Sequence, residues 1–134
     1  MRNHGWPAPF RAVRWERIAI VLREMAEQHA EFTHMARIAE SVIVTGTTNL
    51  LAGCTSMHDL IVVPVPLPDP PYDVIAVRAP SSIRTPPTGQ VIIEHLACTG
   101  HNDRIQRPTG EAVPLFWRFV IEKYGIRPVN QPLN

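Results

Sequence analysis

The chain has 134 residues, of which 45% are hydrophobic and 19% are charged, and its formal net charge is +1. This length and composition fit one globular domain that buries a core of its own without a metal or disulfide staple. So small a net charge produces no overall field that would attract nucleic acid or an anionic membrane surface, so a strongly basic or acidic binding protein is excluded.

The location and origin of the chain are predicted from three further features. No stretch approaches the ~20 apolar residues that a membrane span needs, and the N-terminus lacks the apolar run of a signal peptide. We therefore expect a cytoplasmic protein with no membrane partner, in which Cys54 and Cys98 are free thiols. Twelve arginines accompany a single lysine, Lys123, a ratio that indicates a GC-rich genome and a bacterial or phage origin.

The chain divides into an arm, one domain and a tail. Residues 1–10 are punctuated by glycine and proline and form the predicted N-terminal arm. Residues 11–125 carry the periodic patterns of a single domain, and residues 126–134 are a proline-punctuated C-terminal tail. The arm has isolated aromatic residues that suit docking, either on the chain's own body or on a neighbouring subunit.

The most regular pattern is a stripe of side chains that recur at spacings of three and four. Its members are Trp15, Ile18, Leu22, Met25, His29, Phe32, Ala36 and Ala39. The stripe predicts one amphipathic helix of about seven turns. Its average spacing of about 3.5 suits packing on the chain's own sheet or pairing with a second copy. We assign the stripe from Trp15 to Ala36 to a homo-oligomer interface. His29 would set register or pH sensitivity there, but the favoured interpretation is a core histidine bonded to a neighbour's carbonyl.

After Glu40 the pattern changes to short β-branched or alternating runs, which are typical of strands. The predicted strands span residues 41–45, 60–65, 72–79, 90–98 and 103–107. A short helical turn is expected within 47–57, and a second helix is expected from residue 109 or 111 to 124, ended by Gly125. The predicted fold class is therefore α+β, a mostly antiparallel sheet of about five short strands with a long N-terminal helix and a C-terminal helix on one face.

Two clusters of cysteine and histidine suggest a metal site. Cys54 and His58 are separated by three residues, and His95, Cys98 and His101 form a second cluster with spacings of two. Zinc is the metal that such ligands would hold. Against this reading, His95 and Cys98 would point to opposite faces of a straight strand, so free cysteines and loop histidines are the simpler interpretation.

Other candidate chemistry is weaker still. The polar turn His101, Asn102, Asp103 and Arg104 is the best single guess for a binding surface, although an ordinary hairpin turn has the same residues. Glu31 and His34 have the spacing of carboxylate di-metal sites, but both lie off the apolar stripe, so no metal site is expected there. Serine, cysteine, histidine and aspartate neighbours within one loop rarely form a catalytic triad, so no catalytic residue is assigned.

A nucleic-acid interface would use the basic N-terminal segment. Its arginines are Arg2, Arg11, Arg14 and Arg17, interleaved with aromatic residues. Phosphate contact and base stacking use these residue types. The balanced charge of the remaining chain makes a nucleic-acid partner the least favoured reading.

The sequence as a whole favours a non-enzymatic domain that self-associates and works by binding. It would act as a sensor-like ligand-binding domain or as a component of a larger protein assembly, without a cofactor. A small metal-dependent enzyme or zinc sensor built on the cysteine and histidine clusters is the first alternative, and a nucleic-acid-binding protein is the second. The ligand, the partner and the oligomeric state are not indicated by any motif.

Overall fold

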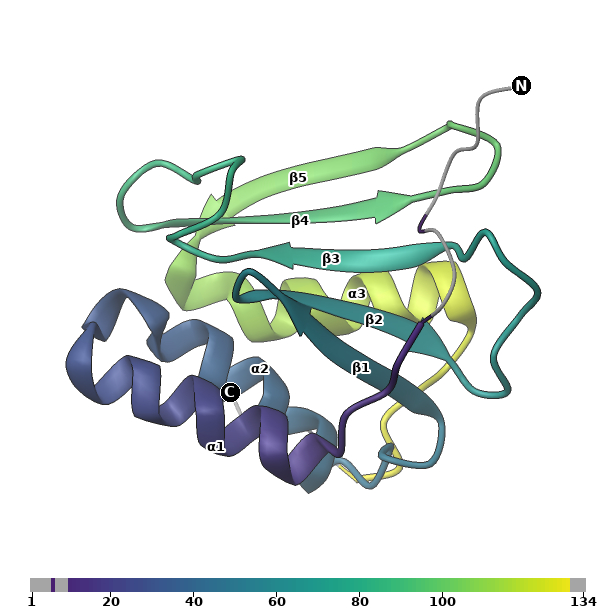
Figure 1. The fold of residues 1–134 in the computed structure, drawn as a ribbon, viewed down its shortest axis with the longest axis horizontal. Helices are drawn as coiled ribbons and strands as arrows, with labels where there is room; N and C mark the ends of the chain where they lie inside the picture. Colours follow the sequence, from purple (N-terminus) through teal and green to yellow (C-terminus); the bar gives the residue numbers. More distant parts are fainter. Residues whose placement is uncertain (1–5, 7–9, 131–134) are drawn as a thin grey trace.

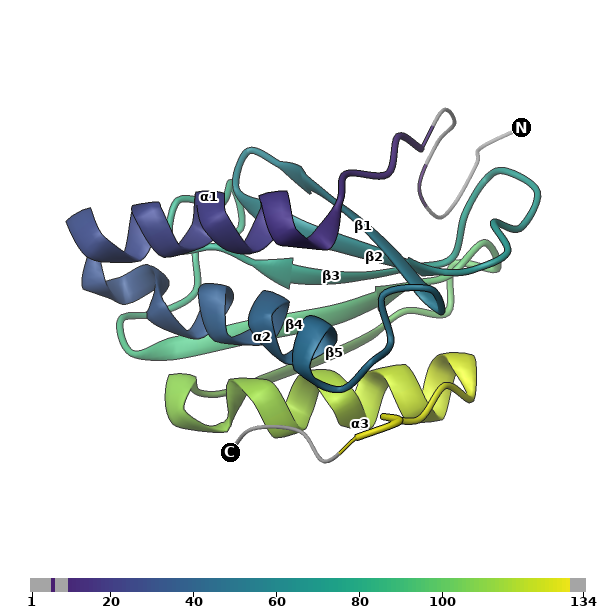
Figure 2. The same ribbon diagram turned by 90° about the horizontal axis from the view of Figure 1, so that it is seen from below.

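The computed structural model describes residue 6 and residues 10–130, and the arrangement of their elements is drawn in Figures 1 and 2. The helices are α1 (Trp15–Gln28), the 3₁₀ turn η1 (Ala30–Phe32), α2 (Thr33–Val44), the 3₁₀ turn η2 (Thr109–Glu111) and α3 (Ala112–Tyr124). The strands are β1 (Leu51–Ser56), β2 (Asp59–Pro64), β3 (Val74–Arg78), β4 (Gln90–Leu96) and β5 (Asp103–Pro108).

The strands form one sheet in the order β1-β2-β3-β4-β5, with every neighbouring pair antiparallel. The helices lie together on one side of it (Figure 2). The α+β class and the antiparallel sheet are thus confirmed. None of the helices in the described part of the chain is both long and apolar enough to cross a membrane.

The prediction of one continuous N-terminal helix is wrong, because the chain turns back on itself at His29. This residue has extended φ and ψ angles of −137° and 95°, and α1 and α2 pack as a hairpin on either side of it. Arg23 of α1 donates to both carboxylate oxygens of Glu40 in α2, at 2.9 and 2.5 Å. A straight helix of 25 residues would measure about 37 Å, whereas a strand of seven residues spans about 23 Å. The hairpin therefore lets both halves of the stripe cover the sheet.

Two further assignments near the hairpin are corrected. Residues 41–45 form the end of α2 and not a strand, although Val42, Ile43 and Val44 are β-branched. The segment predicted to hold a helical turn contains β1 instead. The predicted strands at 60–65, 72–79, 90–98 and 103–107 correspond to β2 to β5, and α3 ends at Gly125 in the left-handed region (φ 67°) as expected.

The main core lies between the helices and one face of the sheet. Leu22, Met35, Ile38 and Phe116 are fully buried there against alternate residues of the strands. Gly53 of β1 is needed for close packing, because a Cβ at this position would stand 2.8 Å from the Trp15 ring. Packing against Trp15 therefore explains Gly53, which the local sequence pattern indicates only as the end of a helical turn.

A second apolar cluster covers part of the opposite face of the sheet. Ile61, Val63 and Ala76 are buried there beneath Phe10 and Tyr72, whose rings meet edge to face at 5.9 Å. The backbone of Trp6 exchanges two hydrogen bonds with Tyr72, and Val13 N–H donates to the Gly53 carbonyl at 2.8 Å. Of the predicted arm, residues 1–5 and 7–9 lie outside the described residues, and Trp6 and Phe10 contact the chain's own body.

Candidate functional site

The residues of the predicted oligomer interface lie inside the chain's own core. Trp15, Ile18, Leu22, Phe32 and Ala36 are all buried between the helical hairpin and the sheet. Met25 packs at the margin of that core, whereas His29 is exposed at the turn between the helices. Five of the seven residues assigned to the interface thus pack within one chain, and a homo-oligomer through this stripe stays a prediction.

The five proposed zinc ligands are separated by the fold. Cys54 packs at the second apolar cluster, and His58, in the β1–β2 turn, lies edge to face against Phe32 at 5.8 Å. His95, Cys98 and His101 line a groove of about 640 Å³ at the other end of the sheet. No three histidine, cysteine, aspartate or glutamate side chains converge as a metal site within residues 6 and 10–130.

The groove at His95 contains no activated nucleophile. The Cys98 thiol donates to the Pro71 carbonyl at 2.7 Å, and hydrogen bonding to Asp73 raises the pKa of Cys98 above its usual value. Burial lowers the pKa of His95, and the centroid of its ring lies 6.4 Å from that of the Tyr124 ring, in an edge-to-face arrangement. Burial also raises the pKa of the Tyr124 phenol, which donates to the Val62 carbonyl at 2.8 Å.

The predicted binding turn has a structural role in the β4–β5 hairpin. The Asn102 side chain accepts a hydrogen bond from Ala97 N–H at 2.8 Å, and Asp103 pairs with Lys123 of α3. His101 and Arg104 are exposed. A binding role for this turn stays a prediction.

Of the predicted nucleic-acid residues, Arg14 and Arg17 line one surface hollow, which they share with Val13, Glu16 and Ile20. Arg2 lies outside the described residues. Arg11 precedes α1 in the chain and is exposed. Arg14 lies 3.7 Å from the Glu16 carboxylate, and Arg17 follows it on the exposed side of the helix. A nucleic-acid role for these arginines stays a prediction.

The structure draws attention to a residue that sequence reasoning placed in solvent, His34 at the start of α2. Its exposed fraction is 6%, because α2 is buried over more of its surface than the stripe alone: Met35 and Ile38 are fully buried as well as the stripe residue Ala36. Its Nε2 atom is buried and has no hydrogen-bond partner among the described residues. Since buried polar atoms are nearly always paired, this nitrogen calls for an explanation.

The protonation state of His34 follows from its surroundings. Burial lowers the pKa of the imidazole to about 4, against a smaller opposing effect of a hydrogen bond to the Glu31 backbone. The imidazole is therefore neutral at pH 7. Because Nε2 has no partner among the described residues, we assign the contact with the Glu31 backbone to Nδ1 and place the single proton on that nitrogen. Nε2 is left with an unshared electron pair and acts as a hydrogen-bond acceptor.

His34 lines a cavity of about 220 Å³, which we call the His34 cavity. Its lining residues are Ala30, Glu31, Thr33, His34, Pro80, Thr85, Pro86, Pro87, Thr88, Gly89, Gln90 and Thr109. A smaller hollow of about 150 Å³ shares Thr33, His34 and Thr109 with it and extends to Arg37 and Gly110. The cavity therefore lies where the start of α2, the loop between β3 and β4, and the turn before α3 meet.

Two hydroxyl groups of the residues that line the His34 cavity already use their protons within the chain. The Thr33 hydroxyl donates to the Ala30 carbonyl at 2.7 Å, and the Thr85 hydroxyl donates to the Ser82 carbonyl at 2.6 Å. Each hydroxyl oxygen thus keeps lone pairs for another donor. These two oxygens are acceptors for a molecule that brings its own O–H or N–H groups, and the unpaired Nε2 of His34 is buried in a side chain that borders the same cavity.

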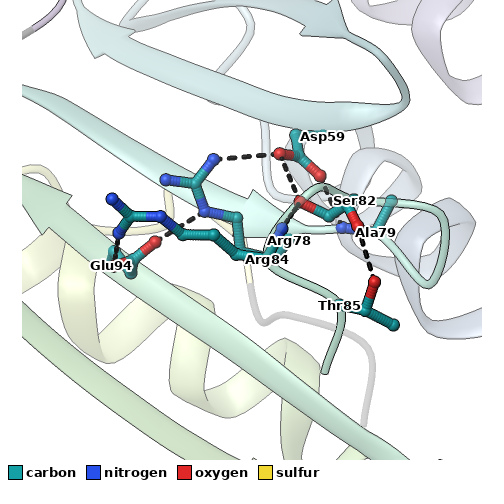
Figure 3. A network of polar contacts seen from close by, with 7 residues as sticks. All are labelled: Asp59, Arg78, Ala79, Ser82, Arg84, Thr85 and Glu94. Atoms are coloured by element: carbon teal, nitrogen blue, oxygen red, sulfur yellow. Dashed lines mark hydrogen bonds and ion pairs between the residues drawn. The ribbon is translucent and has the colours of Figure 1, made fainter. Parts of the chain in front are cut away.

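One wall of the cavity is held by a network of ion pairs (Figure 3). Arg78 of β3 donates to Asp59 at 2.9 Å and to Glu94 at 2.6 Å, and all three side chains are almost fully buried. The network extends into the loop after β3, where Ser82 donates to Asp59 at 2.9 Å. Thr85, whose hydroxyl is bonded to Ser82, also lines the cavity.

This network fixes the loop on the sheet. Asp59 also accepts from Ala79 N–H at 2.7 Å, and Glu94 accepts from Arg84 at 3.1 Å. Buried carboxylates need such partners, because an unpaired charge in the interior is very costly. The two acids and two arginines thus hold the loop of residues 80–89, which forms the wall opposite His34.

Comparison with protein-family models, curated proteins and solved structures finds no match to this chain. The site is therefore interpreted from its own geometry and chemistry. The one spacing that includes His34 in the sequence is its di-metal spacing with Glu31, which does not indicate a buried unpaired nitrogen. The signal that would have indicated its burial is the pair of apolar residues off the stripe, Met35 and Ile38.

Proposed function

We propose that the chain is a non-enzymatic ligand-binding domain, and that its ligand is a small uncharged molecule bound in the His34 cavity. The observation that carries the proposal is Nε2 of His34, a buried atom that has no partner within the described residues, in a side chain that borders the cavity. Binding sites typically combine an enclosed hollow with a few polar groups that fix the ligand. A ligand O–H or N–H group satisfies this nitrogen.

The size and charge of the site define the ligand class. The cavity volume of about 220 Å³ is the volume that about seven water molecules occupy in liquid water. The ligand is therefore smaller than most drug-sized molecules. Glu31 at the cavity and Arg37 at the adjoining hollow carry opposite charges, which gives no preference for an ion of either sign. Small polyols and primary amides combine this bulk with hydrogen-bond donors.

The proposal is tested by NMR with a defined set of probes. Uniformly ¹⁵N-labelled protein is titrated with glycerol, xylitol, urea, acetamide and nicotinamide at millimolar concentrations, and amide shifts are followed. At least one probe is expected to give saturable shifts that map to residues 33–34, 85–90 and 109. Shifts that map to another surface, or no saturable shift with any probe, would contradict the proposal.

Matched histidine variants separate binding from general effects. His34→Leu removes the acceptor and is expected to abolish the saturable shifts. His29→Leu changes an exposed histidine only five positions away and is expected to leave them intact. Equal binding by both variants would show that Nε2 of His34 does not contact the ligand.

A further inference from the structure

The outer edge of β5 is a second feature that the fold leaves open. Five of its six residues are exposed, and no described helix or strand lies beside its outer edge (Figure 1). The opposite edge of the sheet differs, because Val13 bridges to Gly53 of β1. An uncovered strand edge presents free N–H and C=O groups that can pair with another strand.

The backbone groups that β5 offers can be identified from its register. Thr109 N–H donates to the Gly89 carbonyl at 3.0 Å, and this pair continues the β4–β5 register. Hydrogen-bonded pairs alternate along an antiparallel ladder, so residues 103, 105 and 107 turn their backbone groups toward β4. Arg104 and Gln106 therefore turn theirs outward. Pro108 also falls at an outward position, so its lack of an N–H removes no hydrogen bond between β4 and β5.

The side chains of β5 are complementary to themselves. If a second copy pairs antiparallel about a two-fold axis at Ile105, Asp103 of each copy lies opposite Arg107 of the other. The outward backbone groups of Arg104 and Gln106 then face each other and form the hydrogen-bonded pairs. Asp103 and Arg107 fall in the non-hydrogen-bonded pairs, in which opposing side chains are closest.

Arg104 and Arg107 have no carboxylate within ion-pair distance among the described residues. The Arg107 guanidinium donates instead to the Gln106 carbonyl at 2.8 Å, a bond at the exposed edge that the contact between two copies would replace. Asp103 uses one carboxylate oxygen for Lys123 and remains about half exposed. An axis at Arg104 would instead place this arginine against its own copy, and the axis at Ile105 is the one that sets Asp103 opposite Arg107.

We propose that two copies of this chain associate through β5, edge to edge, and so form one continuous antiparallel sheet. Charged edge strands generally prevent sheet pairing, but here each charge meets its opposite in one register. The contact is small, so a weak and reversible dimer is expected. The proposal is independent of the ligand in the His34 cavity.

Charge complementation between two variants tests the proposal by analytical ultracentrifugation. Arg107→Asp gives a chain with acids at both positions, and Asp103→Arg gives a chain with arginines at both. In either homodimer two attractive pairs become repulsive, which raises the dissociation constant by about tenfold to a hundredfold. An equimolar mixture restores both pairs, so it is expected to form a heterodimer at concentrations where each variant alone is monomeric.

A backbone variant provides a test that does not depend on the charges. Gln106→Pro removes an outward N–H without removing a bond to β4, and it is expected to abolish dimerisation, whereas Gln106→Ala is expected to keep it. Circular dichroism melting checks that each variant is folded, and the proline variant decides the question if Asp103→Arg does not fold. A wild-type chain that is monomeric near millimolar concentration overturns the proposal, as does a dimer that none of these variants weakens.

Discussion

Replacing His34 by leucine is expected to remove a defined part of the pH dependence of stability. The pKa of His34 is about 4 in the folded chain, against 6.5 for the unperturbed group. Between these two pH values the unfolded chain binds a proton that the folded chain does not. Lowering the pH therefore favours unfolding, and the free energy of unfolding falls as the pH drops from about 6.5 to 4.

The magnitude follows from the difference between the two pKa values. A difference of about 2.5, at 1.36 kcal/mol for each pH unit, corresponds to about 3 kcal/mol. Wild-type protein should thus lose about 3 kcal/mol more stability than His34→Leu between pH 7 and pH 4. At pH 7 the variant loses one hydrogen bond, worth about 1 kcal/mol, but it also removes an unsatisfied buried acceptor that costs about 1–3 kcal/mol. It should be as stable as the wild type or slightly more stable.

Urea unfolding followed by tryptophan fluorescence at pH 7, 6, 5 and 4 measures this difference. Because the two proteins are compared at each pH, the contributions of the other titrating groups to the free energy of unfolding cancel. His29→Leu serves as the control for a surface histidine. Free energies of unfolding that run parallel for wild type and His34→Leu over this range would refute the argument that His34 is buried and neutral.

Three further substitutions test the packing and the ion-pair network. Gly53→Ala places a Cβ 2.8 Å from Trp15 and should lower the free energy of unfolding by about 1–3 kcal/mol, whereas an unchanged urea midpoint would show that the ring moves aside freely. Arg78→Met leaves Asp59 and Glu94 without their shared partner and should cost about 3–5 kcal/mol. Arg84→Ala, at the exposed end of the network, should cost about 1 kcal/mol or less, and equal losses for both arginines would contradict this account.

The network also supports the cavity, so a variant there should affect binding. Arg78→Met is expected to weaken probe binding at the His34 cavity even at a temperature where the chain remains folded, because the loop of residues 80–89 loses its anchor. The NMR titration described above measures this. Undiminished binding would show that the loop is held by other contacts.

Local patterns in the sequence were enough to predict much of the sheet. The runs that became β2 to β5 alternate or are β-branched and are bounded by proline and glycine, so their backbone state is determined by nearby residues. The same holds for α3, which ends at Gly125 in the left-handed conformation that glycine favours. The α+β class follows from these elements together.

The remaining parts of the fold depend on contacts between distant residues. His29 ends α1 although no glycine or proline stands there, because folding back lets α2 reach the sheet. Gly53 lies within β1 because the Trp15 ring occupies the space of a side chain. These contacts override the local preferences that favoured one long helix and a helical turn.

The candidate site could not be predicted because α2 is buried over more of its surface than the stripe alone. His34 lies off the stripe, but it is buried in α2 together with Met35 and Ile38. The residues that did attract attention, Cys54, His58, His95, Cys98 and His101, are divided between separate regions of the fold. Residue type alone therefore pointed to chemistry that the topology does not assemble.

The most direct test of the central claim is ¹⁵N NMR of the His34 imidazole, in protein labelled at its histidine side chains. The account predicts that Nε2 is unprotonated at neutral pH in the free protein, whereas Nδ1 carries the proton. When a probe from the set above saturates the cavity, the Nε2 resonance should shift as it accepts a hydrogen bond. A protonated Nε2 in the free protein, or an Nε2 resonance that saturating probe leaves unchanged, would contradict the claim that His34 is the acceptor of a binding site.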